Sequence, residues 1–283
     1  MSEEAGQKAA GSDLTARFTA AVVLVAIACV AIYWNGWPFR LLAAAAAGVM
    51  IYEWGNLHRV GRVRSGIGVA LIAASLLLLS CRLFPPDQAC VLEGQGEVIA
   101  VECFQPVWIG LGAFIVLGLL LGLASLRLAM ATGFIYIALP AFALIAIEWA
   151  DPFIVFWLML VTWSTDICAF FAGRAIGGPK LAPRISPNKT WAGLGGGVAG
   201  ALVVGAAAAY GFGLESLFFV LGAPMAILAQ LGDLYESWVK RRAGAKDSSN
   251  LIPGHGGVLD RLDGLLPVAF FTLIALIASL QFS

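Results

Sequence analysis

Residues 129–148 read AMATGFIYIALPAFALIAIE, a run of apolar side chains that ends on one acid, Glu148. An α-helix needs about 20 mostly apolar residues to cross the hydrocarbon core of a bilayer. A run of this length without Lys, Arg or Asp therefore predicts a transmembrane helix. The membrane class of the protein follows from this stretch before any other feature is considered.

Eight further stretches have similar length and character. They lie near residues 17–34, 38–56, 66–84, 107–125, 152–172, 191–212, 216–233 and 264–281. Hydrophobic residues make up 60% of the chain and charged residues only 12%, below the roughly 25% of soluble domains. We predict an all-α polytopic membrane protein with about nine transmembrane helices. Residues 1–150 would hold the N-terminal transmembrane helices, and residues 151–283 a C-terminal catalytic transmembrane region.

Lysine and arginine fall almost entirely on one side of such a chain. If the N-terminus is cytoplasmic and every stretch inserts, all basic residues except Arg40 and Arg82 lie in cytoplasmic segments. Lys and Arg favour the cytoplasmic side of membrane proteins, so this distribution predicts the orientation. The formal net charge is zero, and the charge balance does not argue for a nucleic-acid partner.

The five cysteines fall into two groups. Cys29, Cys81 and Cys168 lie in or at the ends of apolar stretches and are expected to pack as small hydrophobic side chains. Cys90 and Cys103 share the longest outward loop, where the compartment allows a disulfide. A disulfide and two free thiols stay equally open for this pair.

Ionisable side chains concentrate in the last third of the chain, whereas the polar content of the first five stretches is ordinary apart from Glu53. Spacings of three, four and seven put a stripe of polar side chains on one face of the eighth stretch, continued as a helix. They are Gln230, Asp233, Glu236, Ser237, Lys240 and Arg241. A charge facing lipid is costly unless it is paired or hydrated, so the stripe predicts a functional cavity. A juxtamembrane anchor would explain residues 240–242 but not the acids below them.

The segment 244–264 is rich in glycine and contains Pro253 and His255. Such a loop can present backbone N–H groups to phosphate oxygens. Asp260 and Asp263 are three residues apart at the start of the ninth stretch, so one helical turn places both carboxylates on one side. Carboxylate oxygens at the boundary between membrane and water are suitable ligands for Mg²⁺. Helix capping could explain one of the two acids but not both.

The sixth stretch carries Asp166 near its cytoplasmic end. It leads into a segment, 173–190, that holds four basic residues among Gly, Pro, Ser and Thr. These are Arg174, Lys180, Arg184 and Lys189. The composition predicts a phosphate-binding surface with a turn at 186–190.

Two other patterns point to packing or exclude a function. Residues 195–200 match G-x-G-x-x-G but lie inside an apolar stretch with no preceding strand, which favours close helix packing over a dinucleotide site. No P-loop motif occurs. No Ser-His or Cys-His arrangement suggests acyl transfer, whereas carboxylate-held metal with Lys and Arg is typical of phosphoryl or nucleotidyl transfer.

The residues now form a recognisable signature. The pattern Ser237-x-x-Lys240-Arg241, Lys246-Asp247, residues 253–257 and Asp260-Arg261-x-Asp263 resembles that of the phosphatidate cytidylyltransferase (CDP-diacylglycerol synthase) family. The upstream Asp166, Gly173-Arg174 and 185–190 resemble a second motif of the same family. Two positions depart from it, because Ala192 stands where an acid is frequent and Gly264 where serine is frequent.

The resemblance implies an enzyme that transfers CMP from CTP to phosphatidic acid, giving CDP-diacylglycerol and pyrophosphate in phospholipid biosynthesis. It also implies a multi-pass protein of a bacterial inner membrane with a cytoplasmic active site and Mg²⁺, with a second, monovalent cation such as K⁺ as an option. A homodimer is compatible with the family.

Residue roles follow from the same resemblance. Cation binding falls to Asp233, Asp260 and Asp263, with Lys240 and Lys246 in the catalytic set. Substrate binding falls to Ser237, Arg241, Asp247, His255, Arg261, Asp166, Arg184, Ser186 and Lys189. His255 either donates to the departing pyrophosphate or holds the glycine-rich turn, and Asp166 has no single assigned role.

Three other functions are distinguished by their product or by their sequence features. A CTP-dependent kinase of a polyprenol or phytol would release CDP instead of pyrophosphate. A secondary transporter places its ionisable groups near the bilayer midplane, whereas these cluster at the cytoplasmic edge. A catalytically dead homologue is expected to lose acids, and the acids of the signature are all present.

Overall fold

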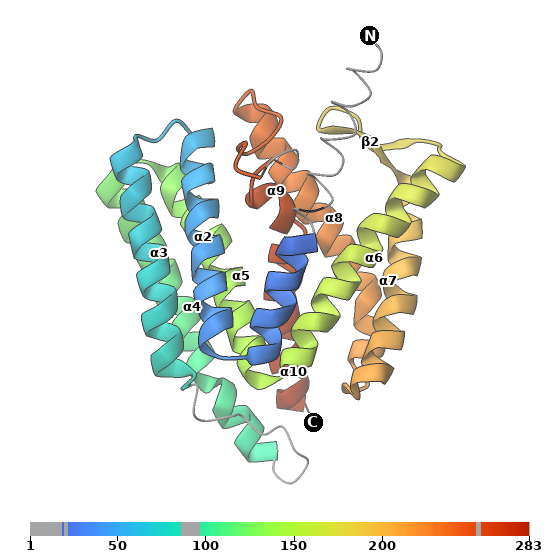
Figure 1. Cartoon of the computed structure of the whole chain (residues 1–283), viewed down its shortest axis with the longest axis horizontal. Coiled ribbons are helices and arrows are strands. Elements are labelled where there is room, and N and C mark those ends of the chain that lie inside the picture. Colours follow the sequence, from blue (N-terminus) through green and yellow to red (C-terminus); the bar gives the residue numbers. More distant parts are fainter. Residues whose placement is uncertain (1–18, 20–21, 86–96, 253–255, 283) are drawn as a thin grey trace.

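The computed structural model describes residue 19 and residues 22–85, 97–252 and 256–282. Within these ranges the chain is almost entirely helical (Figure 1). The elements are a helix at Val22–Trp34, α2 (Trp37–Leu57), α3 (Arg62–Leu83), α4 (Glu97–Ser125), α5 (Leu128–Ala150), α6 (Pro152–Ile176), β1 (Lys180–Ala182), β2 (Ser186–Thr190), α7 (Trp191–Phe212), α8 (Phe218–Arg242), α9 (Leu259–Leu262) and α10 (Leu265–Phe282).

In the part of the chain that the structure describes, each predicted apolar stretch contains a helix. Six of the described helices are long and apolar enough to cross a membrane: α3, α4 from Pro106, α5, α6, α7 and α8. The helix Val22–Trp34 and α10 are apolar but shorter in the part of the chain that the structure describes. The prediction of a polytopic helical membrane protein is therefore confirmed in its general form.

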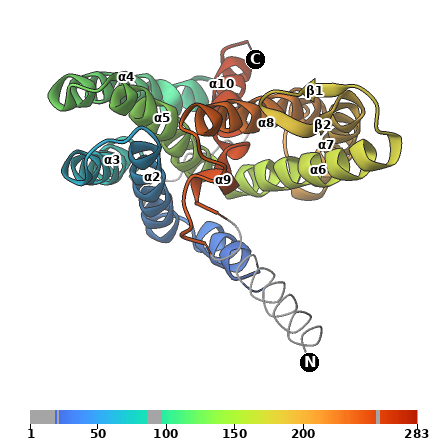
Figure 2. The same cartoon turned by 90° about the horizontal axis from the view of Figure 1, so that it is seen from above.

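The helices form two groups that meet at α10. In one group α2 packs on α3 and α5, and α4 packs on α5; in the other α7 packs between α6 and α8. Figures 1 and 2 show α10 between the groups, where it contacts α5 and α8. α10 thereby places the turn that precedes it next to α8.

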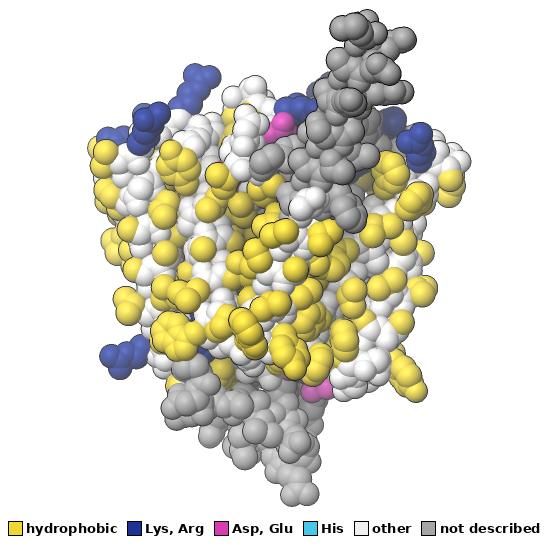
Figure 3. Space-filling model, in the orientation of Figure 1, with side chains coloured by type: hydrophobic (Ala, Val, Ile, Leu, Met, Phe, Trp, Pro, Cys, Tyr) yellow, Lys and Arg dark blue, Asp and Glu magenta, His cyan; other side chains and the backbone are white. Residues whose placement is uncertain are grey.

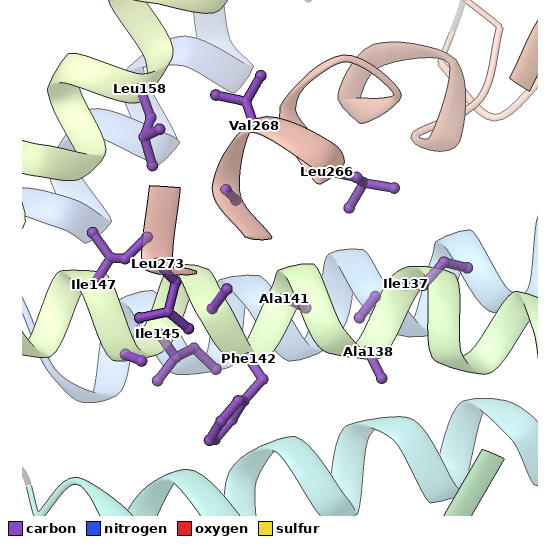
Figure 4. Close-up of a cluster of buried hydrophobic side chains, with 14 of the residues drawn as sticks. Ile137, Ala138, Ala141, Phe142, Ile145, Ile147, Leu158, Leu266, Val268 and Leu273 are labelled. Atoms are coloured by element: carbon purple, nitrogen blue, oxygen red, sulfur yellow. The ribbon is translucent and has the colours of Figure 1, made fainter. Parts of the chain in front are cut away.

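The core is centred on α5, the helix of the 129–148 stretch. Figure 4 shows its Ile137, Ala141 and Ile147 in one buried cluster with Leu273 of α10 and Leu158 of α6. All five side chains are at most 3% exposed. α5 contacts α2, α3, α4, α6 and α10, and the buried share of its apolar window, 72%, is larger than in the other candidate spans. These contacts make it the central helix.

The glycines of 193–200 pack α7 against α6. A Cβ at Gly193 would lie 3.0 Å from the carbonyl oxygen of Ala169, and one at Gly197 would lie 3.0 Å from that of Thr165. A Cβ at Gly200 would collide with the side chain of Cys168. The prediction of close helix packing is confirmed, and with it the packing role of Cys168.

One short hairpin departs from the all-α prediction. β1 and β2 pair antiparallel, and residues 186–190, which the sequence predicts as a turn, form strand β2. Pro179, Pro183 and Pro187 disfavour helix across this segment. A two-stranded hairpin tolerates Pro187 because both of its strands are edges.

Basic side chains gather at one end of the molecule. Figure 3 shows Lys and Arg mostly at the end above a wide hydrophobic surface.

Arg40, an exception to the sequence pattern, is fully buried; its guanidinium donates to the carbonyls of Ser80 and Phe84 at the end of α3. Glu148 interacts electrostatically with it. Arg40 therefore caps the end of α3.

Replacing Arg40 by methionine is expected to destabilise the fold by about 3 kcal/mol, because two carbonyls lose a charged donor and Glu148 keeps a buried charge. Thermal unfolding of the purified protein in detergent measures the loss. Arg82→Met is the matched control, since Arg82 is exposed near the same end of α3. An equal effect of both substitutions would contradict the capping role.

The predicted alternatives for Cys90 and Cys103, a disulfide or two free thiols, concern side chains outside the described residues. Cys90 and the side chain of Cys103 are not among them. Cys29, Cys81 and Cys168 are free thiols and partly buried. This agrees with their predicted role as packing residues.

Candidate active site

The polar half of α8, which the sequence predicts at the cytoplasmic side, carries several side chains of the site. α8 continues to Arg242, so the polar stripe of the sequence lies on one helix as predicted. Ser237 donates to Asp233 at 3.2 Å, and Lys240 donates to Glu236 at 3.1 Å, each pair four residues apart. The hairpin reaches the stripe from one direction, and the loop after α8 reaches it from another.

On the hairpin, Lys189 contacts two side chains of α8. Its Nζ lies 2.6 Å from an Asp233 carboxylate oxygen and 2.9 Å from the amide oxygen of Gln230. Gln230 in turn donates to Asp166 of α6 at 3.4 Å. We call Asp166, Lys189, Gln230, Asp233 and Ser237 the hairpin network. It brings together groups that the sequence places in three separate segments.

A cavity of about 530 Å³ opens beside the hairpin network. Its walls come from α6, the β1–β2 hairpin, α7 and α8. Besides Asp166, Lys189 and Asp233, the polar lining includes Arg174, Lys180, Asn188 and Thr190. Three cations and several hydrogen-bonding groups make this cavity suited to a polyphosphate.

The loop after α8 is fixed by Asp260. Its carboxylate accepts hydrogen bonds from Lys240 Nζ at 2.7 Å, Gly257 N at 2.7 Å, and Ser248 N and Oγ at 2.9 Å each. Burial alone would raise the pKa of Asp260, but hydrogen bonds with Glu236, Lys240, Gly257 and Ser248 outweigh it and hold the pKa at about 2. Asp260 is therefore ionised at neutral pH.

A second carboxylate, Glu53 of α2, fixes the same loop. It is 1% exposed and accepts hydrogen bonds from the hydroxyls of Ser249 at 2.6 Å and Ser248 at 3.2 Å. The N–H groups of Val258 and Leu259 donate to it at 3.0 and 2.8 Å. We call Glu53, Lys240, Ser248, Ser249, Gly257 and Asp260 the loop network. The sequence marks Glu53 as unusual but gives no sign of its partners.

Two glycines allow these carboxylates to approach the backbone. Gly256 has φ +83°, and a Cβ on it would lie 2.5 Å from Asp260 Oδ2. A Cβ on Gly257 would lie 2.5 Å from Glu53 Oε1. Only glycine fits here. Four described N–H groups of this loop, those of Ser248, Gly257, Val258 and Leu259, thus donate to carboxylates, whereas the sequence predicted that the loop presents its N–H groups to phosphate.

Asp263 completes a group of acids near the centre of the site. Gly232 of α8 packs directly on the backbone of Asp263, so the two elements touch next to Asp233. Burial, and secondly the charge of Asp233, raise the pKa of Asp263. One oxygen of the fully buried Glu236 has no hydrogen-bond partner. Acids therefore crowd together here with too few cations beside them.

This surplus of negative charge fits a cation. Asp233 and Asp263 are the candidate carboxylates, and Mg²⁺ in proteins is commonly held by one or two carboxylates with water and phosphate. A cation on Asp233 would share it with Lys189 and Ser237, which contact its two oxygens. The oxygens of Asp260 are already engaged by the loop network. Across the described ranges no three His, Cys, Asp or Glu groups form a complete metal centre.

The remaining predicted residues lie around this centre. Arg241 donates to the carbonyl of Ile185 at 3.5 Å and so joins α8 to the hairpin near Ser186. Arg261 is close enough to Asp166 to interact with it electrostatically. The side chains of Arg184, Lys246 and Asp247 are exposed. Asp247 directly precedes Ser248 of the loop network and lies beside Gly256. His255 lies outside the described residues.

The comparisons with known proteins agree with this arrangement. A model of the cytidylyltransferase family matches residues 15–279. A phosphatidate cytidylyltransferase of Brucella suis biovar 1 (strain 1330) is 39% identical over 280 residues, which cover 91% of each chain. One from Haemophilus influenzae (strain ATCC 51907 / DSM 11121 / KW20 / Rd) is 31% identical over 289 residues, 92% of this chain and 97% of that protein. The chain belongs to the cytidylyltransferase family.

Proposed function

We propose that this protein is a phosphatidate cytidylyltransferase, which makes CDP-diacylglycerol and pyrophosphate from CTP and phosphatidic acid. The observation that carries the proposal is the convergence of lysines and carboxylates on α8, with Lys189 arriving from the hairpin and Asp260 from the loop. The family match supports the same chemistry.

The reaction needs positioning and charge neutralisation more than proton transfer. A phosphate oxygen of phosphatidic acid attacks the α-phosphorus of CTP, and the bond from that phosphorus to the bridging oxygen breaks as pyrophosphate leaves. The second pKa of a phosphate monoester is about 6, so the nucleophile is largely ionised near neutral pH. No general base is required, which agrees with a site dominated by fixed charges.

The residues of the two networks divide the work. Lys189, Lys180 and Arg174 line the cavity of the hairpin network and are placed to bind the triphosphate. Asp233 and Asp263 would hold Mg²⁺, which when bound neutralises phosphate oxygens. Lys240, held by two acids, and Arg241 lie where the lipid phosphate would approach. Surplus carboxylates such as Asp166 and Glu236 leave room for a second, monovalent cation.

The same proposal includes the topology. All nine helices would cross the inner membrane of a bacterium, with the N-terminus and the α8–α10 loop in the cytoplasm. The position of basic side chains at one end supports this orientation (Figure 3). The prediction of a catalytic region at 151–283 stays a prediction, and the Glu53 contacts show that α2 also reaches the loop.

Pyrophosphate release from the purified protein in detergent tests the reaction. CTP, phosphatidic acid and Mg²⁺ are each omitted in turn, and the lipid product is identified by mass spectrometry. We expect release only with all three, a CMP-bearing lipid as product, and full loss with EDTA that added Mg²⁺ reverses.

Other outcomes would assign other functions. CDP as the nucleotide product would make the protein a lipid kinase. An absence of any nucleotide turnover would favour a transporter or an inactive homologue. A homodimer, which the family leaves open, is tested separately by the mass of the protein in detergent.

A further inference from the structure

A second cavity lies on the other side of α8 from the hairpin network. It has a volume of about 780 Å³ and is walled by the end of α2, the start of α5 and the last turns of α8. Its lining includes Trp54, His58, Arg59, Trp238 and Arg242. Neither the resemblance nor the proposed reaction uses these residues. We call this cavity the aromatic groove.

The charge of the aromatic groove is entirely positive. Arg59 and Arg242 are both exposed in it, and none of its described lining side chains is acidic. Within the described residues neither guanidinium forms an ion pair. The acids of α8 face the opposite way, toward the two networks. The groove therefore has two arginines available for an anion from outside the chain.

One of the two arginines packs on an aromatic ring, and further ring contacts order the groove. The Arg242 guanidinium lies 4.8 Å from the centre of the Trp238 ring. His58 stacks on Trp54 at 4.8 Å, and its Nδ1 donates to the Trp54 carbonyl at 2.9 Å because a carbonyl can only accept. The Trp54 indole is itself tied to Ala129 O at 2.8 Å. These contacts preorganise the groove without neutralising its arginines.

The groove lies at the ends of apolar helices, where a bilayer would place its lipid headgroups. α2, α5 and α8 have their boundaries here at Leu57, Leu128 and Arg242, at the end of the molecule where basic side chains gather. Trp and Tyr favour the membrane–water interface, and nearby Lys and Arg attract anionic lipids. Leu128 is 77% exposed at the groove and offers an apolar surface to an acyl chain.

An aromatic wall separates the groove from the catalytic acids. Tyr136 lies 5.6 Å from Trp54 and 4.9 Å from Tyr235, measured between ring centres. On its other side Tyr136 interacts electrostatically with Asp263 and Glu236. A phosphate bound in the groove would thus not reach the acid group directly.

We propose that the aromatic groove binds the phosphate of an anionic glycerophospholipid of the surrounding membrane, as a site distinct from the active site. Arg59 and Arg242 would pair with the phosphate, because guanidinium groups match its oxygens in pairs. Trp238 and Tyr235 would contact the glycerol region, and Leu128 the acyl chain. The inference goes beyond the proposed reaction and requires only that the helices lie in a membrane.

Native mass spectrometry of the full chain from nanodiscs of phosphatidylethanolamine and phosphatidylglycerol tests the site. The double variant Arg59→Gln, Arg242→Gln is expected to retain at least about 10-fold less phosphatidylglycerol than the wild type, a loss of about 1.4 kcal/mol. The matched control is Arg62→Gln, Arg64→Gln, which removes two exposed charges from the start of α3 outside the groove. Its retention should equal that of the wild type.

Further arms separate the sources of phosphate. Thr132→Trp, which fills the groove without removing an arginine, should lower retention in the same way. Three results would overturn the proposal. They are binding of inorganic phosphate without retention of lipid, displacement of the lipid by CTP with Mg²⁺, and equal retention in both double variants. Because the readout is bound lipid and not turnover, failure here leaves the proposed reaction untouched.

Discussion

Replacing Asp260 by asparagine is expected to lower pyrophosphate release at least about 100-fold, a loss of about 2.7 kcal/mol. The carboxylate accepts from Lys240, Ser248 and Gly257. An asparagine in the same place turns its NH₂ group toward at least one of these donors, whichever way it is oriented, and leaves Lys240 with Glu236 as its remaining acid. The loop and Lys240 would both lose their position.

The Asp260→Asn experiment also separates two roles for this residue. Its described contacts favour an anchor, so the Mg²⁺ concentration for half-maximal rate should stay near that of the wild type. Trypsin should then cut faster after Lys246, which is exposed in the freed loop. A raised Mg²⁺ requirement with an unchanged cleavage rate would instead support the metal-ligand role predicted from the sequence.

Replacing Glu53 by glutamine is expected to lower turnover about 10- to 100-fold. Glu53 touches no substrate-binding group directly and is a positioning residue for the loop. Its two oxygens accept from two hydroxyls and two N–H groups. Glutamine replaces one oxygen by a donor in a buried place, at a cost of about 1–3 kcal/mol for each unpaired group.

The measurement for Glu53→Gln is the steady-state rate at varied CTP and phosphatidic acid, together with thermal unfolding. We expect kcat to fall more than either KM rises, because the loop positions Lys240 and leaves the hairpin cavity intact. Glu215→Gln is the control for both Asp260→Asn and Glu53→Gln. Glu215 is exposed just before the N-terminal end of α8, at the opposite end from the loop. A fall in stability with normal turnover of the folded fraction would contradict the positioning role.

The sequence predicted some of the contacts in the site but not others. The stripe on α8 could be predicted because helical periodicity alone places Asp233, Ser237 and Lys240 on one face. The pairing of Lys189 with Asp233 could not, because it depends on a hairpin that proline placement permits but does not specify. Likewise, Arg40 stands in the sequence only as an exception to the cytoplasmic placement of basic residues, and in the structure it is a buried cap.

The sequence by itself determined the membrane class, the helices and the family signature. Each of these depends on local information: the length of an apolar run, the spacing of side chains along one helix, or a contiguous motif. Only the tertiary structure decided that Glu53 of α2 fixes a loop whose Ser248 lies 195 residues later in the chain. The same holds for the aromatic groove, which α2, α5 and α8 form together. Such contacts depend on which helices become neighbours, and apolar helix faces can pack in many ways that hydropathy does not distinguish.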